Sequence, residues 1–93
     1  MEEKAKLVAE LLKVLANENR LLILCVLLEG PMTVGEIGEQ IPPITKPALS
    51  QHLSLLKSHG VLDSIKKGQN VTYFIHDHRV GAVLDVLKCH YCN

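Results

Sequence analysis

The chain has 93 residues, of which 47% are hydrophobic and 22% charged, which fits one small globular domain spanning residues 1–93. Its formal net charge of zero argues weakly against nucleic acid, and no apolar run reaches the roughly 18 residues of a membrane span. The charged beginning MEEKAKLVAELL is not a secretory signal, and three cysteines make no paired disulfide framework, so we expect a cytoplasmic protein with no membrane partner.

The beginning of the chain predicts two helices. Residues 2–16 place leucine and valine at helical spacing, which indicates an amphipathic helix. Asn17 then fits the N-cap of a second helix. Its segment LLILCVLL is apolar on every side, so we expect it at the buried centre of the fold. Gly30 and Pro31 end this helix.

A short third helix follows. Thr33 fits its N-cap, and Glu36, three residues later, completes a capping box in which each residue bonds the backbone of the other. Because proline cannot continue a helix, the segment ends at Pro42 and Pro43.

The stretch TKPALSQHLSLLKSHG predicts a fourth helix over about residues 46–59. Either Thr45 or Lys46 fits its cap. Pro47 in the first turn loses no helical hydrogen bond, and Gly60 is a good stop. Leucines lie on one side of this helix, and short polar residues without a carboxylate lie on the other. Such a polar face suits close approach to a negatively charged partner.

The remainder predicts a hairpin and a last helix. VLDSIKK and VTYFIH are rich in β-branched and aromatic residues around the turn GQN, which indicates a hairpin over about residues 62–75. Residues 78–91 return to helical spacing. The fold class is therefore mainly α with a small β-hairpin. A short helix, a turn and a polar-faced recognition helix form a helix-turn-helix, and the hairpin is its wing.

The recognition helix and the wing lie in the positive part of the chain. Residues 46–79 carry a balance of +3, against −3 over residues 1–45, and phosphate contacts need local Lys and Arg only. Gln51 and the serines are short enough to enter a groove and can bond base edges. His52 borders the leucine stripe and is more often a structural residue, and Lys57 has a plainer interpretation as a solvated charge. The candidate DNA-binding residues are Thr45, Lys46, Ser50, Gln51, His52, Ser54, Lys57, Lys66, Lys67, Gln69 and Asn70.

An enzyme is not expected. The sequence has no Gly-rich phosphate loop and no Ser, His and acid arrangement, and a chain this small leaves little room for a substrate cleft. We therefore expect no required cofactor and no small-molecule substrate. A protein-interaction module is a third class, since winged helices also bind proteins. The positive segment and the polar helix face favour double-stranded DNA.

Four segments together resemble the ArsR/SmtB family of winged-helix repressors: LKVLANENRLLILCVLLEG, VGEIGEQI, ALSQHLSLLKSHGVL and KKGQNVTYFI. The resemblance covers nearly the whole chain. It implies a homodimer built mainly from the helices at residues 2–16 and 78–91, which binds an operator palindrome and releases it when an inducer binds. The turn IPPIT is one residue longer and richer in proline than the family pattern, which bears on the entry angle and the cap of the recognition helix.

The family is best known for metal sensing, but both of its metal-site patterns are incomplete in this chain. Where one pattern needs Cys-x-Cys, the chain has Cys25 and Leu27. The other pattern needs Asp-x-His near the start of the last helix and a further ligand near its end. There the chain has Asp77, Arg79 and finally Asn93. If a metal is the inducer, it would be zinc, cadmium or arsenic. The candidate ligands that remain are Cys25, Cys89, Cys92, Asp77, His78 and His90.

The cysteine positions are more similar to the HlyU/BigR-type branch of redox and persulfide sensors. That likeness implies a reactive pair at Cys25 and Cys92, whose linkage would move two helices and alter the spacing of the recognition helices. Cys89 lies one turn from Cys92, so a bond between those two would constrain little. The expected function is a homodimeric repressor released by thiol oxidation or persulfidation, and the alternative is a metal- or metalloid-responsive repressor. Cys25 also has a plain interpretation as a small buried hydrophobic residue.

Overall fold

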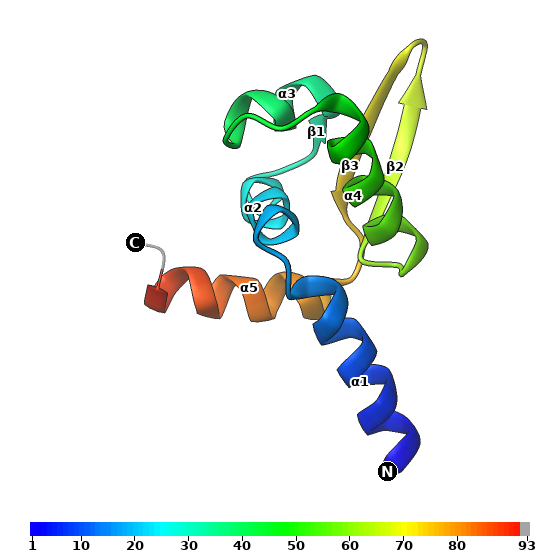
Figure 1. Cartoon of the computed structure of the whole chain (residues 1–93), viewed down its shortest axis with the longest axis vertical. Helices are drawn as coiled ribbons and strands as arrows, with labels where there is room; N and C mark the ends of the chain where they lie inside the picture. The colour runs from blue at the N-terminus through cyan, green and yellow to red at the C-terminus, as the bar shows by residue number, and fades with distance from the viewer. Residues whose placement is uncertain (92–93) are drawn as a thin grey trace.

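The computed structural model describes the backbone of residues 1–91 and the side chains of residues 1–88. Figure 1 shows α1 projecting from one end of the molecule and the hairpin from the other, with α5 crossing near the base of α1. The elements in chain order are α1 (Glu2–Leu15), α2 (Glu18–Leu27), β1 (Met32–Thr33), α3 (Val34–Gln40), α4 (Lys46–Ser58), β2 (Leu62–Lys67), β3 (Asn70–Ile75) and α5 (His78–Tyr91).

Helix α2 forms the centre of the fold, as its all-apolar sequence predicts. Ile23 and Leu24 are fully buried, and α2 packs against α1, α3, α4, α5 and β3. The leucine stripe of α4 faces this centre, because Leu53 and Leu56 are also fully buried. Burial of such side chains contributes about 1.5–3 kcal/mol each relative to leaving them exposed. The polar side of α4 is thereby directed away from the core.

Two predicted caps are confirmed. Thr33 Oγ1 accepts a hydrogen bond from the Glu36 backbone N–H, and Glu36 Oε1 accepts one from the Thr33 N–H at 2.9 Å. Hydrogen bonds from Thr33, chiefly from its backbone, lower the pKa of the Glu36 carboxyl. Of the two candidate caps for α4, the structure selects Thr45, whose Oγ1 accepts from the Ala48 N–H at 3.3 Å. The turn before α4 therefore ends at Thr45, and Lys46 is the first helical residue.

The sheet has three strands rather than the two that the sequence predicts. Strand β1 has two residues and pairs with β3, where Met32 lies opposite Tyr73, and the strand order is β1-β3-β2. A two-residue strand has no periodicity to detect, so only its pairing with β3 reveals it. This pairing anchors the hairpin to the segment that leads into α3.

The hairpin turns tightly at its tip. Lys67 pairs with Asn70, so Asn70 belongs to β3 and the connection is shorter than the predicted GQN turn. Gly68 has a φ of 60°, a left-handed conformation that glycine adopts without steric penalty. The short turn fixes the register along the whole hairpin.

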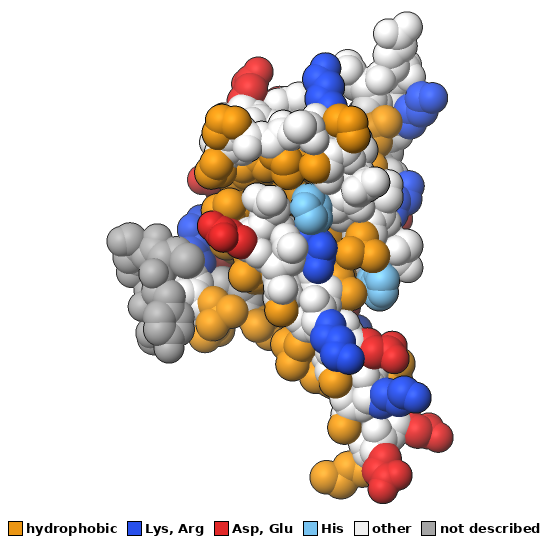
Figure 2. Space-filling model, in the orientation of Figure 1, with side chains coloured by type: hydrophobic (Ala, Val, Ile, Leu, Met, Phe, Trp, Pro, Cys, Tyr) orange, Lys and Arg blue, Asp and Glu red, His pale blue; other side chains and the backbone are white. Residues whose placement is uncertain are grey.

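Helices α1 and α5 leave apolar side chains uncovered. On α1, Leu7, Val8 and Leu12 are more than half exposed. On α5, Val83 and Val86 are 48% and 59% exposed. Figure 2 shows hydrophobic side chains gathered along α1 and around its junction with α5. Among the residues that the structure describes, no helix is long and apolar enough to cross a membrane.

Candidate nucleic-acid interface

The polar face of α4 is exposed on the surface of the helix-turn-helix. Ser50, Gln51 and Ser54 are all exposed and line one shallow depression with two further α4 residues. The predicted face therefore exists as one continuous strip. Ser58 continues this strip, but its hydroxyl donates to the Leu55 carbonyl at 2.8 Å, which turns it back onto the helix.

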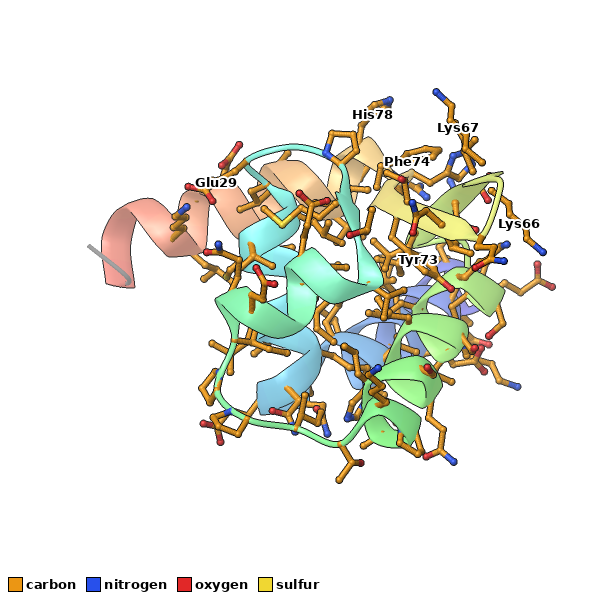
Figure 3. All side chains as sticks on the ribbon, turned by 90° about the horizontal axis from the view of Figure 1, so that it is seen from above. Glu29, Lys66, Lys67, Tyr73, Phe74 and His78 are labelled. Atoms are coloured by element: carbon orange, nitrogen blue, oxygen red, sulfur yellow. The ribbon has the colours of Figure 1, made fainter. Side chains whose placement is uncertain are left out.

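The wing carries its charge at its tip. Lys66 and Lys67 are exposed, and Figure 3 shows both extending away from the body of the molecule at the end of the hairpin. Gln69 and Asn70 are exposed at the same tip. Four side chains that can donate hydrogen bonds thus lie together at the tip of the hairpin, at the end of β2, in the turn and at the start of β3.

Lys57 is not simply solvated. Its ammonium donates a hydrogen bond to the Ser64 hydroxyl at 2.8 Å, which joins α4 to strand β2. The plainer interpretation of Lys57 is corrected to this extent: the side chain is exposed but bridges the recognition helix and the wing. The sequence contains no sign of this contact, because it depends on how β2 packs against α4.

His52 lies at the edge of the core and is half-buried. Its Nδ1 is 3.3 Å from Nη1 of Arg20 on α2, a contact between residues far apart in sequence. Burial first, and the Arg20 charge second, lower the pKa of the His52 imidazole. This environment favours the structural interpretation of His52 that its position beside the leucine stripe indicates.

Arg20 is the residue that the sequence interpretation missed. Its backbone N–H donates to the Asn17 side chain at 3.1 Å, which completes the predicted cap of α2. The cap was visible in the sequence, but the reach of the arginine side chain to another helix was not. The signal in the sequence is the position of Arg20 directly before the apolar run LLILCVL of α2.

The candidate sensing residues are only partly within the described structure. Cys25 is half-buried on α2. Cys92 lies outside the described residues, and Cys89 and His90 lie on α5 with side chains outside them.

Asp77 is committed to an ion pair. The Arg79 guanidinium donates to both carboxylate oxygens of Asp77, at 3.1 and 3.0 Å. These bonds hold the pKa of Asp77 below its ordinary value. His78 beside it is exposed, and within the described side chains no three His, Cys, Asp or Glu residues form a group suited to a metal ion. Arg79 stands where the family's metal pattern has a histidine ligand, and its guanidinium also binds the carboxylate of Asp77, the other candidate ligand there.

A short helix, a turn and an exposed polar helix, followed by a charged hairpin, define a winged helix-turn-helix transcriptional regulator. Residues 17–64 match the family described as bacterial regulatory protein, arsR family, and this chain belongs to that family. It is a regulator of transcription in a DNA-binding family and not an enzyme.

Two curated relatives align over almost the entire chain. The transcriptional activator HlyU of Vibrio cholerae is 38% identical over 92 residues, 99% of this chain and 84% of the relative. The biofilm growth-associated repressor of Xylella fastidiosa is 34% identical over 92 residues, 99% of this chain and 80% of the relative. The relatives thus include both an activator and a repressor.

Solved structures agree with this assignment. Reduced HlyU from Vibrio cholerae has a TM-score of 0.92 and 38% identity, covering 100% of this chain and 97% of that one. The repressor BigR from Xylella fastidiosa has a TM-score of 0.90 and 33% identity, covering 100% and 94%. A Mycobacterium bovis domain described as a homodimeric winged helix-turn-helix has a TM-score of 0.82 and 27% identity, covering 95% and 81%.

Proposed function

We propose that this protein is a homodimeric repressor that binds double-stranded operator DNA with α4 in the major groove and the wing on the flanking backbone. The observation that carries the proposal is the exposed face of α4, formed by Ser50, Gln51 and Ser54, with the charged wing tip beside it. Helix α4 contains no carboxylate, so nothing on it repels phosphate. A helix fits the width of the major groove, where base edges offer donors and acceptors to short polar side chains.

The exposed apolar residues of α1 and α5 support the dimeric part of the proposal. A second copy of the chain would cover them. A small domain buries only a limited apolar core by itself, so burial of this surface in a dimer would add stability. A dimer would also present two α4 helices, which matches the half-sites of a palindromic operator about one helical turn apart.

Replacing Gln51 with alanine tests the proposed reading of bases by α4. We expect operator affinity to fall by about 1–3 kcal/mol if Gln51 makes a bidentate base contact, with little change in binding to unrelated DNA. Fluorescence anisotropy with the operator and a scrambled duplex measures both. Gln40→Ala is the matched control, because Gln40 is an exposed glutamine on α3 outside the polar face. Equal losses on the two duplexes would contradict base reading by Gln51.

Replacing Lys66 and Lys67 together with alanine tests the wing. We expect weaker binding to every sequence, because phosphate contacts carry no base information. The slope of log affinity against log salt should fall by about 0.9 for each phosphate that the wing no longer neutralises. A salt titration measures the slope, and Lys4→Ala with Lys6→Ala on α1 removes the same charge far from the wing. An unchanged slope in the wing variant would remove the wing from the interface.

We further propose that oxidation or persulfidation linking Cys25 with Cys92 releases the operator. The support is the position of Cys25 on α2, which packs against both α4 and α5, together with the likeness to HlyU and BigR. One thiolate attacks a disulfide or polysulfide donor and displaces a thiolate from it. The second thiolate then displaces the remaining donor group, so two protein thiols are oxidised and the donor is reduced. A bond from Cys25 on α2 to Cys92 would shift α2, the helix against which α4 packs.

A further inference from the structure

Arg20 sits where three helices meet. It is in the first turn of α2, and its backbone is fixed by the Asn17 cap. Its Nε donates to the Val14 carbonyl at 2.6 Å, and its Nη1 lies 3.3 Å from His52 Nδ1. One side chain thus contacts the end of α1 and the middle of α4 from the start of α2.

The contact with Val14 satisfies the end of α1. The last four carbonyls of a helix lack helical partners, and Val14 is one of these. A positive charge at the carbonyl end of a helix is also favourable. The arginine fork is thereby oriented, because the bond to Val14 fixes Nε and leaves the terminal nitrogens directed elsewhere.

The contact with His52 determines the state of the imidazole. A guanidinium has donors only, so His52 Nδ1 must be the acceptor in this bond. A histidine that accepts at Nδ1 is neutral and carries its proton on Nε2. Protonation of Nδ1 would replace the bond with two facing positive charges, and the lowered pKa of His52 agrees with this.

We propose that Arg20 is a positioning residue for DNA binding, which holds α4 against the corner of α1 and α2 and keeps His52 as a neutral Nε2–H donor. The inference rests on the proposed DNA-binding function and deepens it. The Lys57 contact with Ser64 joins α4 to the wing. The Arg20 contact with His52 joins α4 to α2 in the same way. Displacement of α1 or α2 reaches α4 through this side chain.

NMR of the ring nitrogens tests the His52 state without DNA. In the wild type we expect His52 with an unprotonated Nδ1, a protonated Nε2 and a pKa below the ordinary value of about 6.5. Arg20→Met should abolish the single tautomer. It should also raise the pKa of His52 above its wild-type value, while burial still holds that pKa below the ordinary value. A His52 with unchanged tautomer and pKa in Arg20→Met would overturn the proposal.

A second variant guards against loss of folding. If Arg20→Met does not fold, as judged by circular dichroism, Arg20→Lys keeps the charge while its point ammonium cannot reproduce the two-armed contact. The folded lysine variant should then lose the single His52 tautomer. Retention of that tautomer would count against the proposal as directly as it would in the methionine variant.

Operator binding supplies the functional measurement. Arg20→Met should bind about tenfold more weakly, a difference of about 1.4 kcal/mol. Arg79→Met is the matched control, since the Arg79 side chain is 88% exposed and, among the described residues, its guanidinium bonds only Asp77. The operator affinity of this variant should change little. If the wild type bound no operator, the proposed function would fail while the NMR result stood. If it bound and Arg20→Met bound equally well, the positioning role alone would fail.

The pH profile separates positioning from a merely structural role. Helices α2 and α3 and strand β2 pack against α4, and among the described residues Arg20 of α2 is the charged group that lowers the pKa of His52. The hydrogen bond between Arg20 and His52 therefore exists above this pKa and breaks as the pH falls through it. Wild-type affinity should fall over that window relative to His52→Gln, which accepts a hydrogen bond but does not titrate. Parallel profiles for the two proteins would overturn the role of His52.

Discussion

Replacing Val83 and Val86 of α5 together with glutamate should yield a folded monomer that no longer binds the operator. Both side chains are about half exposed in a single chain, at 48% and 59%, so the substitution leaves the core intact. Across a dimer interface, the glutamates would face their copies and repel them, and burying them would require desolvation of the charge. Because a palindrome needs two recognition helices at fixed spacing, operator affinity should drop to the level of unrelated DNA.

Sedimentation and circular dichroism measure assembly and folding of this variant. Ile65→Glu is the matched control, since Ile65 is 53% exposed but lies on the wing, and it should leave the sedimentation coefficient unchanged. Leu84→Glu is unsuitable, because Leu84 is 2% exposed and a charge there would disrupt the core. A double variant that still sediments as a dimer would place the interface elsewhere.

Replacing Cys25 with serine should make operator binding insensitive to thiol oxidants. The wild type should release DNA after tetrasulfide treatment and recover with dithiothreitol, because the linkage between helices is reversible. Cys25→Ser and Cys92→Ser should each stay bound, since either change removes one end of the bridge. Gel shifts with and without the oxidant, paired with intact-protein mass spectrometry, measure the response and the bond.

Cys89→Ser is the matched control for the thiol prediction. It removes a cysteine one turn from Cys92 and should still respond. The metal-responsive alternative makes a different prediction: release by cadmium or arsenite, an ultraviolet thiolate band, and a defect in Cys89→Ser as well. A normal oxidant response in Cys25→Ser, with one soft metal bound per subunit, would replace the redox assignment with the metal one.

The sequence by itself determined the features that depend on neighbouring residues. The hairpin follows from two β-rich segments around a glycine turn, and it is found with a turn one residue shorter than predicted. The Thr33 and Glu36 box and the Asn17 cap follow from spacings of a few residues, and each is found as predicted. The leucine stripe of α4 likewise defined its opposite, polar face. Local backbone geometry and helical periodicity are sufficient for such features, because every partner lies within one or two turns.

Only the tertiary structure decided which helical faces are buried and which side chains meet. Val83 and Leu84 are neighbours on the predicted last helix, and packing against α2 and β3 decides that Leu84 lies in the core while Val83 is 48% exposed. The two-residue strand β1 exists through its pairing with β3. Arg20 and His52, like Lys57 and Ser64, come from different elements, and their contacts depend on how α2, α4 and β2 pack together. Periodicity specifies the direction of a side chain on its own helix, whereas packing specifies what that side chain reaches.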